Sequence, residues 1–233
     1  MNIFNRCSVC LTVVAVLFSI LPASAYAGEG NWMVRVRAIK VAPDNKSDAG
    51  NGNTLNTSNF GPVPAISAIV PENFIKISNE VVPEIDISYF FSSNIAAEVL
   101  LGGEIRHNVG IAKGPLMEEN IGQLKYLAPT VILQYHFLPD GFIRPYVGLG
   151  INYTHVTSYR LRSSVAGADI NIDKNSVGAA LQAGVDIKLN KQLYLNFDAK
   201  KIQVRTDLNV GGTKFTREKV DPLVLGIGLG YRF

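Results

Sequence analysis

The chain has 233 residues, of which 47% are hydrophobic and 18% charged, and its 22 basic and 19 acidic residues give a formal net charge of +3. A charge so close to neutral argues against nucleic acid or any other strongly charged partner. The length is compatible with a single domain.

The first element in chain order is an N-terminal export signal. Arg6 provides a positive charge, an apolar run covers residues 9–21, and two overlapping A-x-A motifs follow, the second ending at Ala27. The apolar run is too short for a permanent membrane helix. We therefore expect residues 1–27 to be a cleaved signal peptide and residues 28–233 to form the mature domain.

The cysteines and histidines give no sign of a metal site. Cys7 and Cys10 both lie in the expected signal peptide, so the mature chain would have no disulfide and no thiolate ligand. His107, His136 and His155 do not have the spacing of metal ligands. We expect neither a metal nor a cofactor.

Eight later segments alternate large apolar residues with small or polar ones. A period of two places successive side chains on opposite faces, which is the pattern of a β-strand. No apolar run after Ala27 approaches the ~20 residues of a membrane helix. The expected strands are 31–40, 82–91, 95–103, 126–137, 147–153, 177–189, 193–199 and 223–233.

The connections between these strands alternate in length. Short turns are expected at 92–94, 139–141 and 190–191, and longer connections at 41–81, 104–125, 158–175 and 207–213. Short periplasmic turns and longer extracellular loops are typical of outer-membrane barrels. An even number of strands places both termini on the periplasmic side.

The last strand carries the clearest membrane pattern. From Leu223 to Tyr231 every second residue is large and apolar, and the pattern ends where Asp221 would enter it. This face is long enough for the ~9–11 residues that a tilted strand needs to cross a bilayer. The terminal aromatic residue, Phe233, resembles the C-terminal signal of outer-membrane barrels, so we expect the barrel-assembly machinery to recognise it.

Charges within the strands lie on the phase opposite the bulky apolar residues. A Lys or Arg facing lipid near the bilayer centre would cost about 2–4 kcal/mol. Lys201 is the exception, and either a β-bulge or the edge of the membrane would account for it. An aromatic girdle is expected at the periplasmic strand ends, formed by Trp32, Tyr89, Phe91, Tyr135, Phe137, Tyr231 and Phe233.

Together these patterns predict an all-β fold, an eight-stranded antiparallel transmembrane β-barrel in the bacterial outer membrane, with lipid as its surroundings. The alternative is a secreted soluble β-sandwich, whose strands also alternate. A sandwich would carry charges on its outer face and would not need an aromatic girdle.

The inward phase of the barrel has a charged part and an apolar part. The charged residues, on the periplasmic side, form either a gate or a salt-bridged plug, of which we favour the plug; they are Arg35, Arg37, Asp86, Glu98, His136, Asp186, Lys188, Asp198 and Arg232. The apolar residues form either a ligand pocket or ordinary barrel filling; they are Ile39, Leu100, Ala128, Ile132, Ala180 and Val224.

The first long connection is unusually apolar for an extracellular loop. We interpret it as a cap over the barrel mouth, and contact with lipid or a neighbouring barrel is the alternative. The residues that carry this interpretation include Val63, Ile66, Ile69 and Phe74.

Several motifs resemble the outer membrane protein W family, in the same order along the mature chain. The most specific is Arg144-Pro-Tyr-Val-Gly-Leu-Gly-Ile-Asn-Tyr-Thr154, and the others are Tyr126-Leu-Ala-Pro-Thr130, Ala183-Gly-Val-Asp186, Asp221-Pro222 and Gly230-Tyr-Arg-Phe233. The resemblance implies an eight-stranded barrel with an apolar channel that passes small hydrophobic molecules. It also implies a neck at Leu100 and Lys200, where Lys200 departs from the aromatic residue of some members.

We therefore expect an outer-membrane barrel that binds small hydrophobic ligands near Leu100, Ile39, Ile132 and Val224 and passes them sideways between strands. A second hypothesis is a surface interaction barrel, in which the extracellular loops act as receptor or adhesin. A third is a lipid A-modifying enzyme that uses His155, but that residue falls on the lipid-facing phase. We expect no enzymatic activity.

Overall fold

The computed structural model describes residues 31–47, 54–56, 67–69, 75–112, 117–163, 168–210 and 213–233. The expected signal peptide, residues 1–27, lies outside these ranges. Within them, no helix is both long and apolar enough to cross a membrane.

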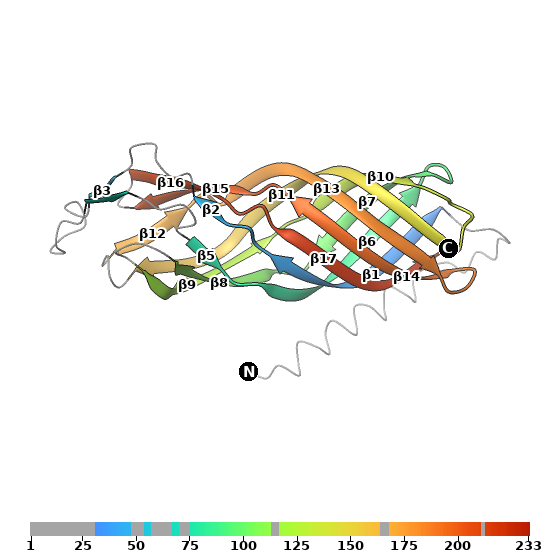
Figure 1. Cartoon of the computed structure of the whole chain (residues 1–233), viewed down its shortest axis with the longest axis horizontal. Helices are drawn as coiled ribbons and strands as arrows, with labels where there is room; N and C mark the ends of the chain where they lie inside the picture. The colour runs from blue at the N-terminus through green and yellow to red at the C-terminus, as the bar shows by residue number, and fades with distance from the viewer. Residues whose placement is uncertain are drawn as a thin grey trace, which may run out of the picture.

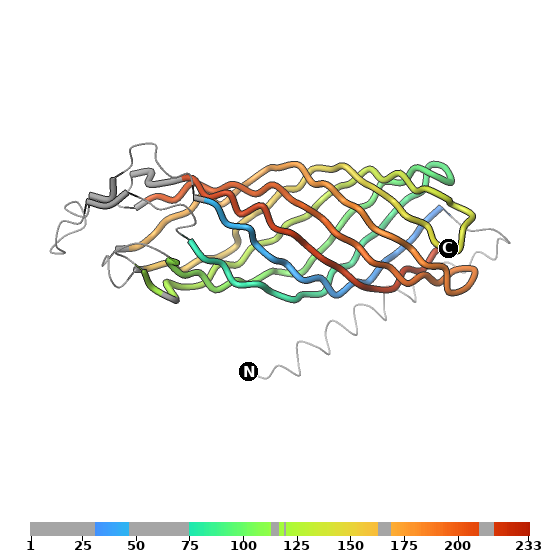
Figure 2. Tube along the Cα trace, viewed as in Figure 1, coloured from blue at the N-terminus to red at the C-terminus, as the bar shows by residue number. Residues whose placement is uncertain are grey.

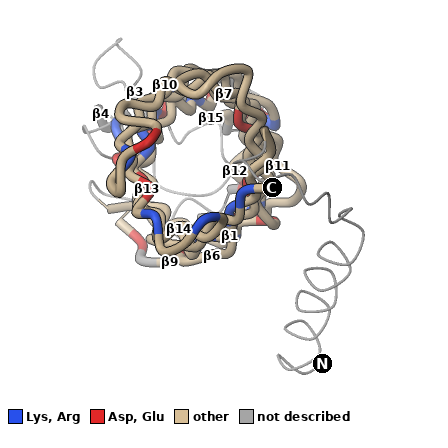
Figure 3. Tube along the Cα trace, turned by 90° about the vertical axis from the view of Figure 1, so that its right-hand side faces the viewer, with Lys and Arg blue, Asp and Glu red and all other residues tan. Residues whose placement is uncertain are grey.

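Eight antiparallel strands close into a barrel, which confirms the expected fold class. The first strand hydrogen-bonds to the second on one side and to the last on the other, so the ring has no free edge in this part of the chain. Figure 1 shows the tilted strands from the side and Figure 3 shows the closed ring from one end. In order around the ring the strands are β1 (Trp32–Ala42), β6 (Glu80–Phe90), β7 (Ile95–Gly102), β10 (Thr130–His136), β11 (Ile143–Ser163), β13 (Asn175–Lys188), β14 (Leu193–Ile202) and β17 (Leu223–Arg232).

The barrel continues beyond the membrane as an extension, on the left of Figure 2, and Figure 1 shows that this extension contains strands. The long connections expected at 104–125, 158–175 and 207–213 are present, but they contain strands that were not predicted. The extension contains the outer half of β11 together with β2 (Lys46–Ser47), β5 (Ile75–Ile77), β8 (Ile105–Ile111), β9 (Glu118–Leu127), β12 (Ala168–Ile172), β15 (Arg205–Val210) and β16 (Thr213–Lys219). Two further short strands, β3 (Thr54–Asn56) and β4 (Ser67–Ile69), pair with each other.

A change of environment explains why the extension is hard to see in the sequence. Ile105, Val109 and Ile111 of β8 are buried, whereas Arg106 and Asn108 between them are exposed. The inward apolar phase thus continues, but the outward phase becomes polar because it meets water instead of lipid. A search for bulky lipid-facing residues passes over such strands.

The exposed face of the barrel is apolar along its membrane-spanning part. Leu133, Leu149, Ile151 and Ile227 are each at least half exposed, on three different strands. Such a continuous apolar surface suits lipid and not water. Lys201 lies at the outer edge of this surface, and the ladders of β14 with β13 and β17 run through it without a register shift. Of the two explanations for Lys201, the register agrees with the membrane edge and not with a bulge.

The wall of the barrel is interrupted between its third and fourth strands. Leu100 of β7 pairs with Thr130 of β10, and the next recorded pair is Ile105 of β8 with Tyr126 of β9. No backbone hydrogen bond joins 101–104 to 127–129 in the described structure. Pro129 contributes to this interruption because proline has no N–H to donate. We call this unpaired stretch the wall break.

Inside the barrel, a glycine makes room for a large aromatic side chain. Gly184 of β13 lies directly opposite Tyr146 of β11. A Cβ atom added at Gly184 would lie only 2.4 Å from the Tyr146 hydroxyl oxygen. The absence of a side chain at Gly184 therefore allows the Tyr146 ring to fold across the lumen.

Candidate functional site

The side chains inside the barrel form layers along its axis. At the periplasmic end Met33, Phe90, Ala96 and Tyr194 make a small apolar cluster. A layer of charged and amide side chains follows, which we call the ionic plug. Beyond the plug lies a second apolar cluster that includes Leu100, and a third cluster fills the extension.

Arg35 is at the centre of the ionic plug and is fully buried. Its guanidinium group makes a two-pronged contact with Asp186, with Nη2 2.7 Å from Oδ2 and Nε 3.2 Å from Oδ1. Nη1 donates to Ser88 Oγ at 2.7 Å and to Glu98 Oε1 at 2.9 Å. Paired hydrogen bonds of this kind fix both the position and the orientation of an arginine.

Arg37 and Lys200 bind the remaining carboxylates of the plug. Arg37 Nη1 lies 2.6 Å from Asp86 Oδ2. Lys200 Nζ lies 2.5 Å from Glu84 Oε1 and 3.0 Å from Asp198 Oδ1. Because removing one partner would leave a buried charge unpaired, each of these contacts is costly to break.

Neutral polar side chains complete the plug, and the sequence analysis did not assign them to it. Tyr146 donates to Asp198 Oδ2 at 2.8 Å, and Asn196 donates to Asp186 Oδ1 at 2.7 Å. Gln182 donates to Glu98 Oε2 at 2.8 Å, and Gln134 donates to the same oxygen at 2.7 Å. All four lie on the inward phase. A search of that phase for every polar residue, and not only for ionisable ones, would have found them.

The structure places almost all the expected plug residues inside the barrel. Lys188 is only partly buried, at the periplasmic end of β13; the buried ones are Arg35, Arg37, Asp86, Glu98, His136, Asp186, Asp198 and Arg232. Lys200, which the resemblance places at the neck, belongs to the plug. Its ammonium group is stabilised among carboxylates, whereas an apolar neck would strip it of water without compensation.

A cavity lies above the plug. Its lining includes Leu100, Ile39 and Val224. Gly102 and Ala128 place the wall break in the same lining. Ile132, expected to contact ligand, belongs to the same apolar cluster as Leu100, but it is fully buried and does not line the cavity.

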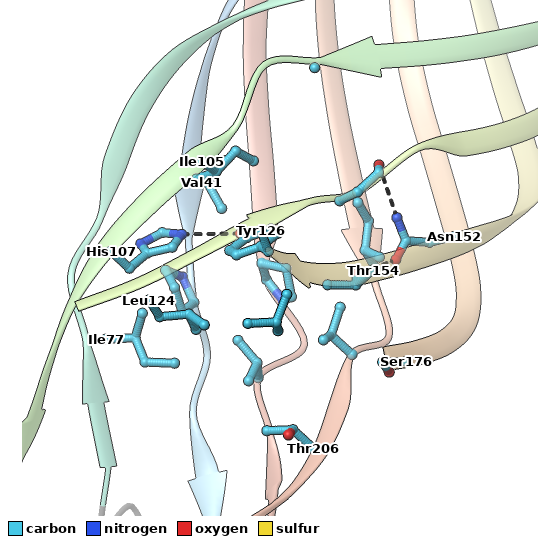
Figure 4. A pocket seen from close by; sticks show the side chains of 18 of the residues that line it. Val41, Ile77, Ile105, His107, Leu124, Tyr126, Asn152, Thr154, Ser176 and Thr206 are labelled. Carbon is cyan, nitrogen blue, oxygen red and sulfur yellow. Dashed lines mark hydrogen bonds between the residues drawn. The ribbon is translucent and has the colours of Figure 1, made fainter. Parts of the chain in front are cut away.

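A histidine and a tyrosine form part of the outer cavity wall (Figure 4). His107 Nδ1 lies 2.5 Å from the Ser78 carbonyl oxygen, so this nitrogen carries the proton. Nε2 then accepts from the Tyr126 hydroxyl at 3.0 Å. His107 lies beyond the exposed Glu104, outside the membrane-spanning segments. Burial lowers its pKa below the usual value, and the bond to Ser78 opposes this shift only in part.

An asparagine supports the wall break. The Asn152 amide group donates to Thr130 Oγ1 at 2.8 Å and to the Ala128 carbonyl at 3.2 Å, and its Oδ1 accepts from Thr154 Oγ1 at 2.7 Å. Figure 4 shows Asn152 and Thr154 side by side in the cavity wall. The side chain thus supplies a hydrogen bond to a carbonyl of the segment that has lost its strand partner.

Two other predicted features, the loop cap and His155, lie outside the plug and the cavity. Val63, Ile66 and Phe74 of the expected cap lie outside the described residues and Ile69 lies in β4, so the cap stays a prediction. His155 is partly exposed, with Nδ1 2.7 Å from Asn175 Oδ1.

Comparison with known proteins agrees with this architecture. The model of the OmpW family matches residues 28–233. An uncharacterized outer-membrane protein of Sinorhizobium fredii, y4mB, is 37% identical, over 89% of this chain and 82% of the relative. Outer membrane protein W of Vibrio cholerae is 29% identical, over 97% of this chain and 99% of the relative. The crystal structure of OprG from Pseudomonas aeruginosa has a TM-score of 0.68 at 23% identity and covers 88% of this chain and 97% of its own.

Proposed function

This chain belongs to the OmpW family and is an outer-membrane barrel, and we propose that it takes up small hydrophobic molecules from outside and releases them sideways into the membrane. In this proposal the ligand rests in the cavity above the ionic plug. It leaves through the wall break, between the third and fourth strands.

The observation that carries the proposal is the position of the cavity beside the wall break. Gly102 and Gly103 line the cavity, and open space surrounds both, because a Cβ atom added at either would meet nothing within 4 Å. The outward neighbours Leu101 and Leu127 are exposed on the lipid-facing surface. An apolar molecule could therefore pass from an apolar cavity into lipid without crossing water.

The ionic plug supports the same route. A molecule that continued along the axis would have to displace the ion pairs of Arg35 and Arg37 and then the apolar cluster at the periplasmic end. An apolar solute cannot replace those hydrogen bonds, and unpaired buried charges are costly. We infer that the plug closes the way to the periplasm.

The extracellular extension favours a second candidate function, surface interaction. The outer end of β11 and the strands β12, β15 and β16 project beyond the membrane, and they present polar side chains such as Arg162 of β11 and Arg217 of β16 to water. In that case the barrel would be a scaffold, changes in the extension would alter activity, and changes in the cavity would not.

We also propose two partners and the absence of catalysis. Lipid surrounds the apolar surface, and the barrel-assembly machinery recognises Phe233, whose backbone N–H donates to the Trp32 carbonyl at 3.0 Å. The family is one of outer-membrane barrels, and the hydroxyl group of Thr157, two residues after His155, donates to Glu104 Oε1 at 2.7 Å. This arrangement gives no support to a lipid A-modifying enzyme.

The test is a binding measurement on the refolded mature barrel. A long-chain apolar amphiphile is titrated by calorimetry in short-chain detergent, with Leu100→Arg as the variant that fills and charges the cavity. Gln123→Arg, an exposed position on β9, adds the same side chain elsewhere. We expect saturable binding that Leu100→Arg abolishes and Gln123→Arg retains. Folded wild-type protein that binds nothing would favour surface interaction instead.

A further inference from the structure

Glu84 is the acidic side chain that the cavity shares with the ionic plug. By strand register it lies opposite Arg37 of β1 on one side and Gly102 of β7 on the other. The residue is 6% exposed, and it lines the cavity. A carboxylate so placed is the first charged group that a ligand in the cavity would meet at the floor.

The two oxygens of this carboxylate differ. Oε1 accepts from Lys200 Nζ at 2.5 Å and from Arg37 Nη1 at 3.4 Å. Oε2 has no hydrogen-bond partner within the described part of the chain. A carboxylate oxygen that meets no protein donor retains its full capacity to accept hydrogen bonds. A ligand that supplies a donor to Oε2 would use this capacity.

The formal charge of the surroundings favours the same kind of ligand. Five carboxylates of the plug, those of Glu84, Asp86, Glu98, Asp186 and Asp198, face three cations, Arg35, Arg37 and Lys200, so 3 − 5 gives −2. Arg144 and Arg232 lie together on the periplasmic side of this layer, away from the cavity. A negative floor attracts a cation and repels an anion, most strongly where water is excluded.

There is also space for a polar group beside Glu84. Its neighbour Gly102 has no side chain, and a Cβ atom there would meet nothing within 4 Å. Gly102 lies at the wall break, so the group would enter where the cavity and the wall break meet.

We propose that the cavity selects amphiphiles whose polar end donates a hydrogen bond or carries a positive charge, such as a primary alcohol or an alkylammonium ion, and that Glu84 Oε2 binds this end. Alkyl carboxylates of the same length are disfavoured. This inference rests on the proposed function, because it requires the cavity to bind ligand.

The test compares three decyl ligands that differ only in the polar end: 1-decanol, decylammonium and decanoate. Each is titrated by calorimetry into the refolded mature barrel at neutral pH. We expect decylammonium and 1-decanol to bind at least about tenfold more tightly than decanoate, the equivalent of one charge-assisted hydrogen bond. In Glu84→Gln, decylammonium should lose about tenfold in affinity, while 1-decanol changes by less than about threefold.

Matched variants keep the result interpretable. Glu104→Gln removes an exposed carboxylate near the wall break and should leave the ranking unchanged. Glu84→Asp keeps the negative charge but withdraws it by one methylene group, so its preference for decylammonium over decanoate should be intermediate between wild type and Glu84→Gln. This variant tests the assignment if Glu84→Gln does not fold. The ranking of the three ligands is measured on the wild-type protein and depends on neither variant.

The outcomes separate the two proposals. If none of the three ligands binds to folded protein, the proposed function fails and this inference fails with it. If all three bind equally, the function stands and the selectivity is overturned. If the preference survives in both Glu84 variants, the assignment to Glu84 is overturned.

Discussion

The ammonium group of Lys200 and the carboxylate of Glu84 meet across the lumen, with Nζ 2.5 Å from Oε1, although the two residues are 116 positions apart in the sequence. Glu84 lines the cavity, whereas Lys200 lies among carboxylates below it. This contact is the boundary between the apolar and the ionic parts of the lumen. It explains how a lysine is accommodated at a position where the family resemblance implies a bulky apolar neck.

Replacing Lys200 should destabilise the barrel strongly. Lys200→Met keeps most of the side-chain volume but leaves Glu84 and Asp198 without their ammonium partner, at a cost of about 3–5 kcal/mol. Urea unfolding in lipid vesicles measures this, followed by the fluorescence of Trp32, the chain's single tryptophan. In the control, Lys201→Met, an exposed contact with Asp44 is lost, worth at most about 1 kcal/mol. Equal losses in the two variants would contradict the buried plug.

The close approach of Gly184 to Tyr146 predicts a steric penalty. Gly184→Ala should cost about 1–3 kcal/mol, because the new methyl group would overlap the tyrosine ring and force it out of place. Gly103→Ala adds the same methyl group in open space and should change stability little. The same unfolding experiment compares the two, and a harmless Gly184→Ala would show that the Tyr146 ring does not occupy this position.

His107 should make stability depend on pH. Its pKa is lowered in the folded protein relative to the usual 6.5, so the unfolded state binds the proton more readily. The contribution of His107 to the free energy of unfolding is complete above pH 6.5 and is lost as the pH falls towards the folded pKa. The free energy of unfolding should change by at most about 1.4 kcal/mol per pH unit in this range.

His107→Gln serves as the control for this pH effect, since glutamine cannot take up a proton. Unfolding midpoints measured between pH 7.5 and 5 should fall more steeply for the wild type than for the variant. Parallel curves would mean that His107 is not held neutral by its contacts with Ser78 and Tyr126.

Blocking the wall break should slow release without abolishing binding. In Gly103→Phe, the ring would occupy the open space between the cavity and the lipid. Transfer of a hydrophobic fluorescent probe from the external solution into vesicle lipid should slow by about tenfold, which corresponds to about 1.4 kcal/mol in the barrier. Its affinity for the cavity should change by less. Lys191→Phe, in an exposed periplasmic turn, is the control, and unchanged transfer in Gly103→Phe would exclude this exit.

Much of the fold could be predicted from the sequence because a transmembrane strand is a local pattern. The alternation around Leu225, Ile227 and Leu229 shows which side chains face lipid. A single strand already fixes this assignment, and closure of the barrel does not change it. For the same reason the inward placement of Arg35, Arg37 and Asp186 could be predicted before any contact was known. The extension was missed because its outward phase meets water, so strands such as β8 lose the bulky residues that mark the others.

The partners across the lumen and the position of the wall break were decided only by the tertiary structure. A period of two assigns a side chain to one face but does not say which strand lies opposite, and that depends on the closure and stagger of the whole ring. Lys200 illustrates this, because the sequence places it on the inward face but does not show that Glu84 and Asp198 lie beside it. The wall break likewise depends on a mismatch in length between two pairs of residues. Between Leu100–Thr130 and Ile105–Tyr126, one side of the break has four residues, 101–104, and the other side has only three, 127–129. Neither strand alone contains that mismatch, which exists only once the two are paired.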